Sequence, residues 1–146
     1  YGLLRPMDGI VPYRMEHCVT LEATSNKPIN QFWKDRLTDV LIGSVKADDG
    51  TLLHLSTEEY EHLFDWKRVC KEVTVIQPLF YVRQKDGRLK MQAVWAKSCR
   101  GAMVRFILNN RPVTHEELSA FSYEGFEFAP QLGDENNPHF VRENVK

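Results

Sequence analysis

The sequence has few cysteines and lacks the motifs that identify many enzyme families. Its 146 residues include three cysteines, Cys18, Cys70 and Cys99, at wide spacing and without a CxxC pair. This spacing speaks against a zinc ribbon and a thioredoxin-type redox site. A P-loop, a GxGxxG turn, an HExxH helix and a GxSxG elbow are also absent. We expect buried free thiols in a reducing compartment, and we predict no metal site, no cofactor and no identifiable catalytic residue.

Long hydrophobic runs are missing as well. No apolar stretch approaches the length that crosses a bilayer, so we expect no membrane partner. Apolar residues make up 42% and charged residues 27% of the chain, which is ordinary for a folded domain and excludes a disordered, collagen-like or coiled-coil protein. The first residue is Tyr1 rather than Met, so we expect a fragment or a processed product of about one domain.

Charge is balanced over the chain but not along it. The net charge of -1 argues against indiscriminate coating of nucleic acid or anionic membrane. Residues 1–66 carry 6 basic and 11 acidic side chains, residues 67–111 carry 11 and 2, and residues 112–146 carry 2 and 7. A basic middle therefore lies between two acidic flanks. The flanks either confine the positive field to one cleft or cancel it.

Hydrophobic periodicity and turn residues predict a mixture of helices and strands, and hence the α+β class, as one mixed α/β domain. Helices are expected after Ser25 and Asn26, which can cap a helix opened by Pro28, and at the capping boxes Ser56–Glu59 and Thr114–Glu117. Strands are expected over 17–23, 51–55, 73–82, 88–96 and 123–128, with a hairpin turn at 85–87. Residues 97–110 favour a helix. The polar tail at 129–146 is expected to be loose.

The predicted helix at 97–110 carries the clearest candidate site. Lys97, Arg100 and Arg111 fall on one stripe at helical spacing, and Arg105 points to another side. Lys97 and Arg100 would lie in the first turn, where free N–H groups and the helix dipole favour an anion. Gly101 would let a ligand approach closely. The alternative is that Arg100 and Arg105 form ion pairs with acidic side chains from the flanks.

The opening segment is the second candidate. Arg5, Asp8, Tyr13, Arg14 and Glu16 stand among prolines and aliphatic residues. Alternating arginines and carboxylates can hold such a loop together by ion pairs, or they can line a cleft. The residue types favour neither interpretation over the other.

Several segments, taken together and in order, resemble the YaaA peroxide-stress protein family. They are YGLLRPMDGIVPYRME at 1–16, INQFWKDRL at 29–37, HLSTEEY at 54–60, AKSCRGAMVRFILNNR at 96–111 and ELSAFSYEGFEF at 117–128. The match at 96–111 is the strongest. The resemblance covers residues 1–128 and leaves 129–146 unmatched. Relatives continue for roughly a hundred residues before the position of Tyr1, so we expect this chain to be the C-terminal portion of a longer family sequence.

The resemblance implies a cytoplasmic bacterial protein linked to peroxide survival and to limiting free iron. It also implies an unusual mixed α/β fold with a positively charged cleft, and similarity to DNA-binding proteins. Double-stranded DNA is therefore the expected partner, and the oligomeric state stays open. By this resemblance, the residues expected to bind nucleic acid or phosphate are Arg5, Arg14, Lys97, Arg100, Gly101 and Arg105, with Asp8, Tyr13 and Glu16 supporting the same cleft.

Two functions from different classes fit these residues. The first is a DNA-binding stress protein that acts without turnover. The second is an enzyme acting on a nucleotide or another phosphate-bearing small molecule, in which Asp8 or Glu16 would serve as general acid or base. Direct iron binding by histidines and carboxylates ranks last, because no 2-His-1-carboxylate cluster is recognisable.

Overall fold

The computed structural model of the chain describes residues 3–5, 7–10, 19–20, 22–111 and 114–143. The chain divides into two compact units, one comprising residues 1–52 and 56–74 and the other residues 53–55 and 75–146. The predicted α+β class is confirmed, because both helices and mixed parallel and antiparallel strands are present.

The first unit is built around a long helix, α1 (Ile29–Ala47). Leu37, Ile42 and Val45 are buried. Helical spacing in the sequence predicts an apolar face that includes Leu37, Val40 and Val45; Leu37 and Val45 confirm it, whereas Val40 is 52% exposed. The predicted cap is wrong in detail. The residue before the helix is Pro28, without a side-chain cap, and Ser25 adopts a left-handed turn conformation with φ of 55° instead of capping the helix.

The expected strand at 17–23 is also wrong where it can be compared. Thr20 forms only an isolated bridge with Pro28, and Glu22–Thr24 is a 3-10 helix, η1. The oxygen of the Thr24 hydroxyl lies 2.6 Å from the Lys27 carbonyl oxygen, to which the hydroxyl donates. This local hydrogen bond stabilises a turn, because threonine side chains compete with extended backbone pairing. His17, Cys18 and Leu21 lie outside the described residues.

Two short helices follow in the first unit. In α2 (Glu58–Glu61) the cap residue is Thr57, one residue later than the expected cap Ser56, and the Thr57 side chain makes no capping hydrogen bond. The sequence patterns did not predict the helix α3 (Trp66–Glu72). Its cap residue is Asp65, whose side chain accepts a hydrogen bond from the Arg68 N–H at 3.3 Å. An Asp at this position satisfies a backbone donor that the helix itself leaves free.

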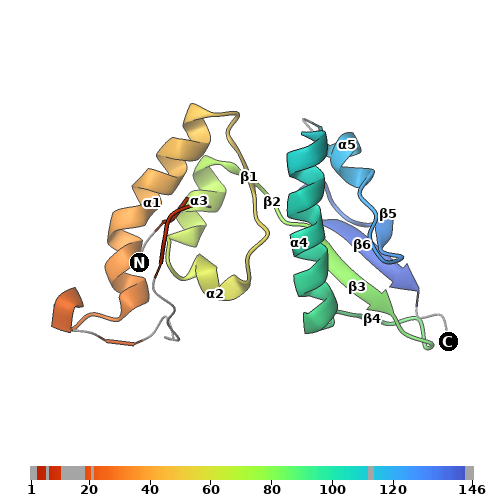
Figure 1. Ribbon diagram of the computed structural model, residues 1–146, viewed down its shortest axis with the longest axis horizontal. Helices are drawn as coiled ribbons and strands as arrows, with labels where there is room; N and C mark the ends of the chain where they lie inside the picture. The colour runs from red at the N-terminus through yellow and green to blue at the C-terminus, as the bar shows by residue number, and fades with distance from the viewer. Residues whose placement is uncertain (1–2, 6, 11–18, 21, 112–113, 144–146) are drawn as a thin grey trace. The chain divides into compact units, whose positions relative to one another are not determined.

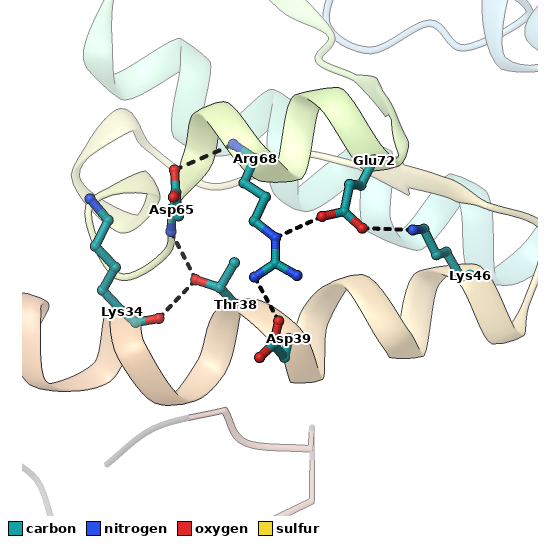
Figure 2. A network of polar contacts seen from close by, with 7 residues as sticks. All are labelled: Lys34, Thr38, Asp39, Lys46, Asp65, Arg68 and Glu72. Atoms are coloured by element: carbon teal, nitrogen blue, oxygen red, sulfur yellow. Dashed lines mark hydrogen bonds and ion pairs between the residues drawn. The ribbon is translucent and has the colours of Figure 1, made fainter.

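A chain of hydrogen bonds connects α1 to α3 through Thr38 (Figure 2). The buried Thr38 hydroxyl donates to the Lys34 carbonyl at 2.8 Å and accepts from the Asp65 N–H at 2.9 Å. One hydroxyl thus satisfies two backbone groups, which explains why a polar side chain is tolerated at a buried position of α1.

Charged side chains complete the same contact. Arg68 of α3 bonds Asp39 of α1 at 2.7 Å and Glu72 of its own helix at 2.6 Å, and Glu72 also accepts from Lys46 of α1 at 2.7 Å (Figure 2). Both neighbours donate hydrogen bonds to the Glu72 carboxylate, and they lower its pKa below the ordinary value of 4.5. The pairs are solvent-exposed, so they orient the helices more than they stabilise them.

Two short strands pair with each other: β1 (Thr51–Leu53) and β2 (Thr74–Ile76). The predicted strand at 51–55 is therefore shorter than expected. The β-rich stretch at 73–82 is divided into two strands after Ile76, next to Pro78, because proline cannot donate to a strand ladder.

The second unit contains a four-stranded sheet in the order β4-β3-β6-β5. Its strands are β3 (Leu79–Arg83), β4 (Leu89–Lys90), β5 (Glu127–Gly133) and β6 (Pro138–Glu143). The pairs β3–β4 and β5–β6 are antiparallel, whereas β3 and β6 run parallel. The hairpin expected around residues 85–87 is confirmed, with Gly87 at φ of 82°.

One face of this sheet packs against α4 (Ala93–Asn110) and α5 (His115–Ser119) (Figure 1). The capping box of Thr114 and Glu117 is present as predicted. The buried residues of this core come from the sheet, from both helices and from the turn before β5; they are Phe80, Val82, Cys99, Met103, Leu118, Phe121, Phe126 and Phe140. Edge-to-face and stacked rings around Phe80 and Phe140 fill the space between the layers.

The expectation of a loose tail at 129–146 is wrong for the residues that the structure describes. β5 extends to Gly133, and β6 lies between β3 and β5 in the interior of the sheet. Phe140 is completely buried there. The polar residues at 133–137 form only the connection between the strands, and their composition hides the short apolar run that follows.

Of the strand expected at 123–128, only residues 127 and 128 are in strand β5; the residues before them form a turn. Tyr123 and Phe126 form an isolated bridge around Glu124 and Gly125, whose φ values are 51° and 79°. Two successive left-handed residues are typical of a tight turn of the primed type. β5 starts directly afterwards at Glu127.

Candidate functional site

The helix that carries the predicted basic residues starts earlier than expected. The stretch at 88–96, expected as a strand, ends its strand at Lys90, and α4 begins at Ala93 with Gln92 as the cap residue. Hydrogen bonding within α4 starts with the Ala96 N–H, which donates to the Gln92 carbonyl at 2.9 Å. Lys97 and Arg100 therefore lie beyond the first turn, and the prediction that they flank its free N–H groups is wrong.

The physical reason lies in the tertiary packing of residues 93–96. Val94 and Trp95 favour strands in isolation. In the structure Ala96 is buried, and the Trp95 ring packs against Phe126 with centroids 5.9 Å apart. Burial of this side of the helix outweighs the local preference.

The predicted basic residues of α4 lie on its surface. Lys97, Gly101 and Arg105 are exposed and Arg100 is partly buried. No atom lies within 4 Å of the position that a Cβ on Gly101 would occupy. Arg111 ends the helix in a left-handed conformation with φ of 48°.

Within the described residues, Lys97, Arg100 and Arg105 form no ion pair, although both acidic flanks are largely described. Other arginines of the same unit do form them: Arg88 contacts Asp86 at 2.6 Å and Arg83 contacts Glu143 at 3.0 Å. The alternative prediction, in which acidic flank residues neutralise Arg100 and Arg105, is not what the described residues show. The α4 cations are thus available to an external anion.

The opposite side of α4 anchors these cations to the core. Cys99 and Met103 are completely buried, as the helical spacing predicts. Burial raises the pKa of the Cys99 thiol to about 11, although the nearby charges of Arg142 and Arg100 oppose this rise. The thiol is therefore protonated at neutral pH, which is unfavourable for a nucleophile.

Cys70 differs from Cys99 in being exposed. Partial desolvation and the charge of Glu61 raise its pKa. Cys18 lies outside the described residues. Neither described cysteine shows the lowered pKa of an activated thiolate.

In the opening segment, Arg5 and Asp8 bind each other. The Asp8 carboxylate accepts from the Arg5 backbone N–H at 2.8 Å and from its guanidinium at 2.9 Å. These hydrogen bonds lower the pKa of Asp8. The ion-pair interpretation of this segment is therefore the one that the described residues support, and Asp8 is ionised at neutral pH.

Three predicted site residues, Tyr13, Arg14 and Glu16, lie outside the described residues. Arg5 and Asp8 belong to the first unit, and the α4 cations belong to the second. A single cleft shared by Arg14 and Arg100 stays a prediction.

An open groove of about 500 Å³ in the second unit lay outside the sequence-based prediction. It is lined by strand residues, the Glu124–Gly125 turn and the ion pair of Arg83 with Glu143; the strand residues are Glu127, Phe128, Ala129, Gln131, Val141 and Arg142. The available signal was the short apolar pair Phe140–Val141, an aromatic and a β-branched residue of the types enriched in strands. The polar loop before it concealed that signal.

The described residues form neither a candidate metal-binding cluster nor a helix able to span a membrane. There, no group of three or more His, Cys, Asp and Glu side chains is placed to hold a metal ion. None of the described helices has the length and apolar character required to cross a membrane.

Comparisons with a family model and with individual proteins agree on the family to which this chain is similar. A family model described as "Peroxide stress protein YaaA" matches residues 1–132. A UPF0246 protein of Bacteroides fragilis is 49% identical over 141 residues, covering 97% of this chain and 54% of its own length. UPF0246 proteins of Bacteroides thetaiotaomicron and Porphyromonas gingivalis are 46% and 48% identical, over 97% and 98% of this chain and 54% and 56% of their own lengths. The chain thus spans about half the length of these relatives, and its expected place in their C-terminal portion stays a prediction.

Proposed function

Because this chain belongs to the YaaA peroxide stress protein family, we propose that it serves a bacterial peroxide response by binding double-stranded DNA through the cations of α4. In this proposal the protein acts in the cytoplasm and limits iron-dependent oxidative damage to the DNA that it covers. Lys97, Arg100 and Arg105 contact phosphates, and no turnover is required.

The observation that carries the proposal is the absence of ion pairs at these three cations within the described part of the chain. Arg83 and Arg88, in the same unit, are neutralised by carboxylates. Unpaired cations on a rigid helix retain their full attraction for phosphate, whereas paired ones must first lose a partner. The three α4 cations therefore supply positive charge for an anion although the net charge of the chain is -1.

Binding of this kind has a characteristic dependence on salt. Each cation that neutralises a phosphate releases a counterion, so the logarithm of the affinity falls by about 0.9 per tenfold increase in salt for each contact. Sequence preference should be weak, because phosphate contacts position a protein without reading bases.

The test measures the affinity of the 146-residue chain for a duplex oligonucleotide over a range of NaCl concentrations. We expect Arg100→Gln and Arg105→Gln each to reduce the slope of the logarithm of the affinity against the logarithm of the salt concentration by about 1, because each removes one phosphate contact. Arg88→Gln serves as the matched control, since Arg88 is occupied by Asp86, and it should leave the slope unchanged.

Two results would count against DNA binding. One is an affinity independent of salt, and the other is an equal effect of Arg88→Gln and Arg100→Gln. Saturable binding of a mononucleotide, without salt-dependent binding of duplex DNA, would instead support an enzyme acting on a phosphate-bearing small molecule.

A further inference from the structure

The exposed side of α4 is unexpectedly apolar. Val94, Val104 and Leu108 are 77%, 44% and 71% exposed. Together with Lys97 and Gly101 they recur at intervals of three and four residues, so these five residues share one face of the helix. We call this set the α4 outer stripe.

A solvated helix face normally carries polar side chains opposite its buried side. On α4 the buried side is already supplied by Ala96, Cys99 and Met103. The outer stripe thus places three exposed apolar side chains on a second side of one helix, and exposed apolar side chains gathered on one face mark an interaction site.

The shape of the stripe suits a second helix. Gly101 is at its centre, and nothing lies within 4 Å of the position of an added Cβ there. A glycine at this place lets another backbone approach closely. Val94 and Leu108 each lie about two helical turns from Gly101, one on either side.

The charges of α4 argue against a second copy of this chain as the occupant. In an antiparallel pair centred on Gly101, Lys97 of one copy would face Arg105 of the other, because both lie four residues from Gly101. In a parallel pair Lys97 would face Lys97. Either arrangement juxtaposes like charges, which disfavours association.

The length of the relatives suggests a different occupant. The chain spans 54% to 56% of the relatives described above, so family proteins of this length contain a large further portion. We propose that the α4 outer stripe is the docking surface for an amphipathic helix from that portion, with apolar side chains against Val94, Val104 and Leu108 and a carboxylate against Lys97.

This surface shares Lys97 with the phosphate contact proposed above, but the two differ at Arg100 and Leu108. Arg100 lies at the edge of the buried face, outside the stripe, and can bind phosphate whether or not the stripe is covered. Leu108 has no charge and no part in phosphate binding. A change at Leu108 therefore tests docking, and a change at Arg100 tests DNA binding.

The experiment compares this chain alone with a chimera in which it replaces the matching segment of the Bacteroides thetaiotaomicron relative. Leu108→Lys should leave the thermal midpoint of the chain alone unchanged and lower that of the chimera by roughly 4 °C or more, since a lysine would replace a buried leucine. Asn109→Lys is the matched control, because it adds the same charge at the adjacent exposed position outside the stripe. It should leave both midpoints unchanged.

A second measurement covers a chimera that fails to fold. The remainder of the relative is co-expressed with this chain as a separate polypeptide, and it should copurify with the parent chain and with Asn109→Lys but not with Leu108→Lys. Failure to copurify with the parent chain, or equal effects of Leu108→Lys in the chain alone and in the chimera, overturns the proposal. A dimer of the chain that Leu108→Lys dissociates also overturns it, since the second copy would then be the occupant.

Discussion

Gly133 and Gly43 show how the same residue type serves different purposes. Gly133 ends β5 with φ of 74°, and an added Cβ would overlap the backbone carbonyl oxygen of Asn137 and lie 2.8 Å from Cδ2 of His139. Gly43 is within α1, and nothing lies within 4 Å of its added Cβ. Only Gly133 is therefore required by the backbone and by its neighbours.

We expect Gly133→Ala to destabilise the protein by about 1–3 kcal/mol, because alanine is strained at positive φ and its Cβ would clash with the Asn137 carbonyl oxygen and the His139 ring. Gly43→Ala should stabilise it by about 0.5–1 kcal/mol, since alanine favours a helix interior. Urea unfolding monitored by circular dichroism measures both changes. Equal effects of the two substitutions would contradict this explanation.

Whether the predicted site residues are paired with other side chains is also a question at the scale of single residues. The sequence predicted that Lys97, Arg100 and Arg105 share one helix, because the apolar residues between them have helical spacing. It left open whether they are paired, since carboxylates distant in sequence could reach them. Side-chain placement answers this for the described residues, and it also shows Asp8 bound to Arg5.

At the scale of elements, the contact of α1 with α3 depends on protonation. Glu72 has its pKa lowered below 4.5 mainly by the hydrogen bonds from Lys46 and Arg68. A carboxyl group whose pKa is lower in the folded state contributes stability above its unfolded pKa and loses it as the pH falls through the folded value. The network in Figure 2 should therefore weaken only in acid.

We expect the urea midpoint of the parent chain to fall between pH 5.5 and pH 3 by more than the midpoint of Glu72→Gln falls. These two pH values lie about a pH unit above and below the ordinary pKa range of carboxyl groups. Glu58→Gln is the control, because Glu58 is an exposed residue of α2, and it should retain the pH dependence of the parent. Molar salt should reduce the difference, since the pairs are exposed. A Glu72→Gln variant with the full pH dependence of the parent would exclude this network as its source.

Element boundaries followed local rules in some places and tertiary packing in others. The box at Thr114–Glu117 formed, because its capping bonds join residues only three apart in the chain. The start of α4 was missed, because burial of Ala96 and the contact of Trp95 with Phe126 depend on distant chain segments.

At the scale of the whole molecule, β6 joins segments that are far apart in sequence. It pairs in parallel with β3 and antiparallel with β5, and it places Phe140 in the core. A chain that ends at Gly133 should therefore lose the cooperative thermal transition and the near-ultraviolet dichroism of the second unit. Glu135→Gln, in the exposed connection before β6, should preserve both.

A truncated chain with an unchanged thermal transition would contradict the central position of β6. Phe140→Ala provides a milder probe, with an expected loss of about 3–5 kcal/mol from removing a fully buried ring. The same measurement distinguishes the observed strand from the loose tail that composition alone predicts.

The sequence by itself determined the α+β class, the apolar faces of α1 and α4, the β3–β4 hairpin and the family. These depend on periodicity, on turn residues and on motifs that are local in the chain. Only the tertiary structure decided that β6 lies inside the sheet, that the α4 cations are unpaired within the described residues, and that α4 has a second apolar side. Strand pairing, ion pairing and exposure depend on contacts between distant segments, which local patterns do not specify.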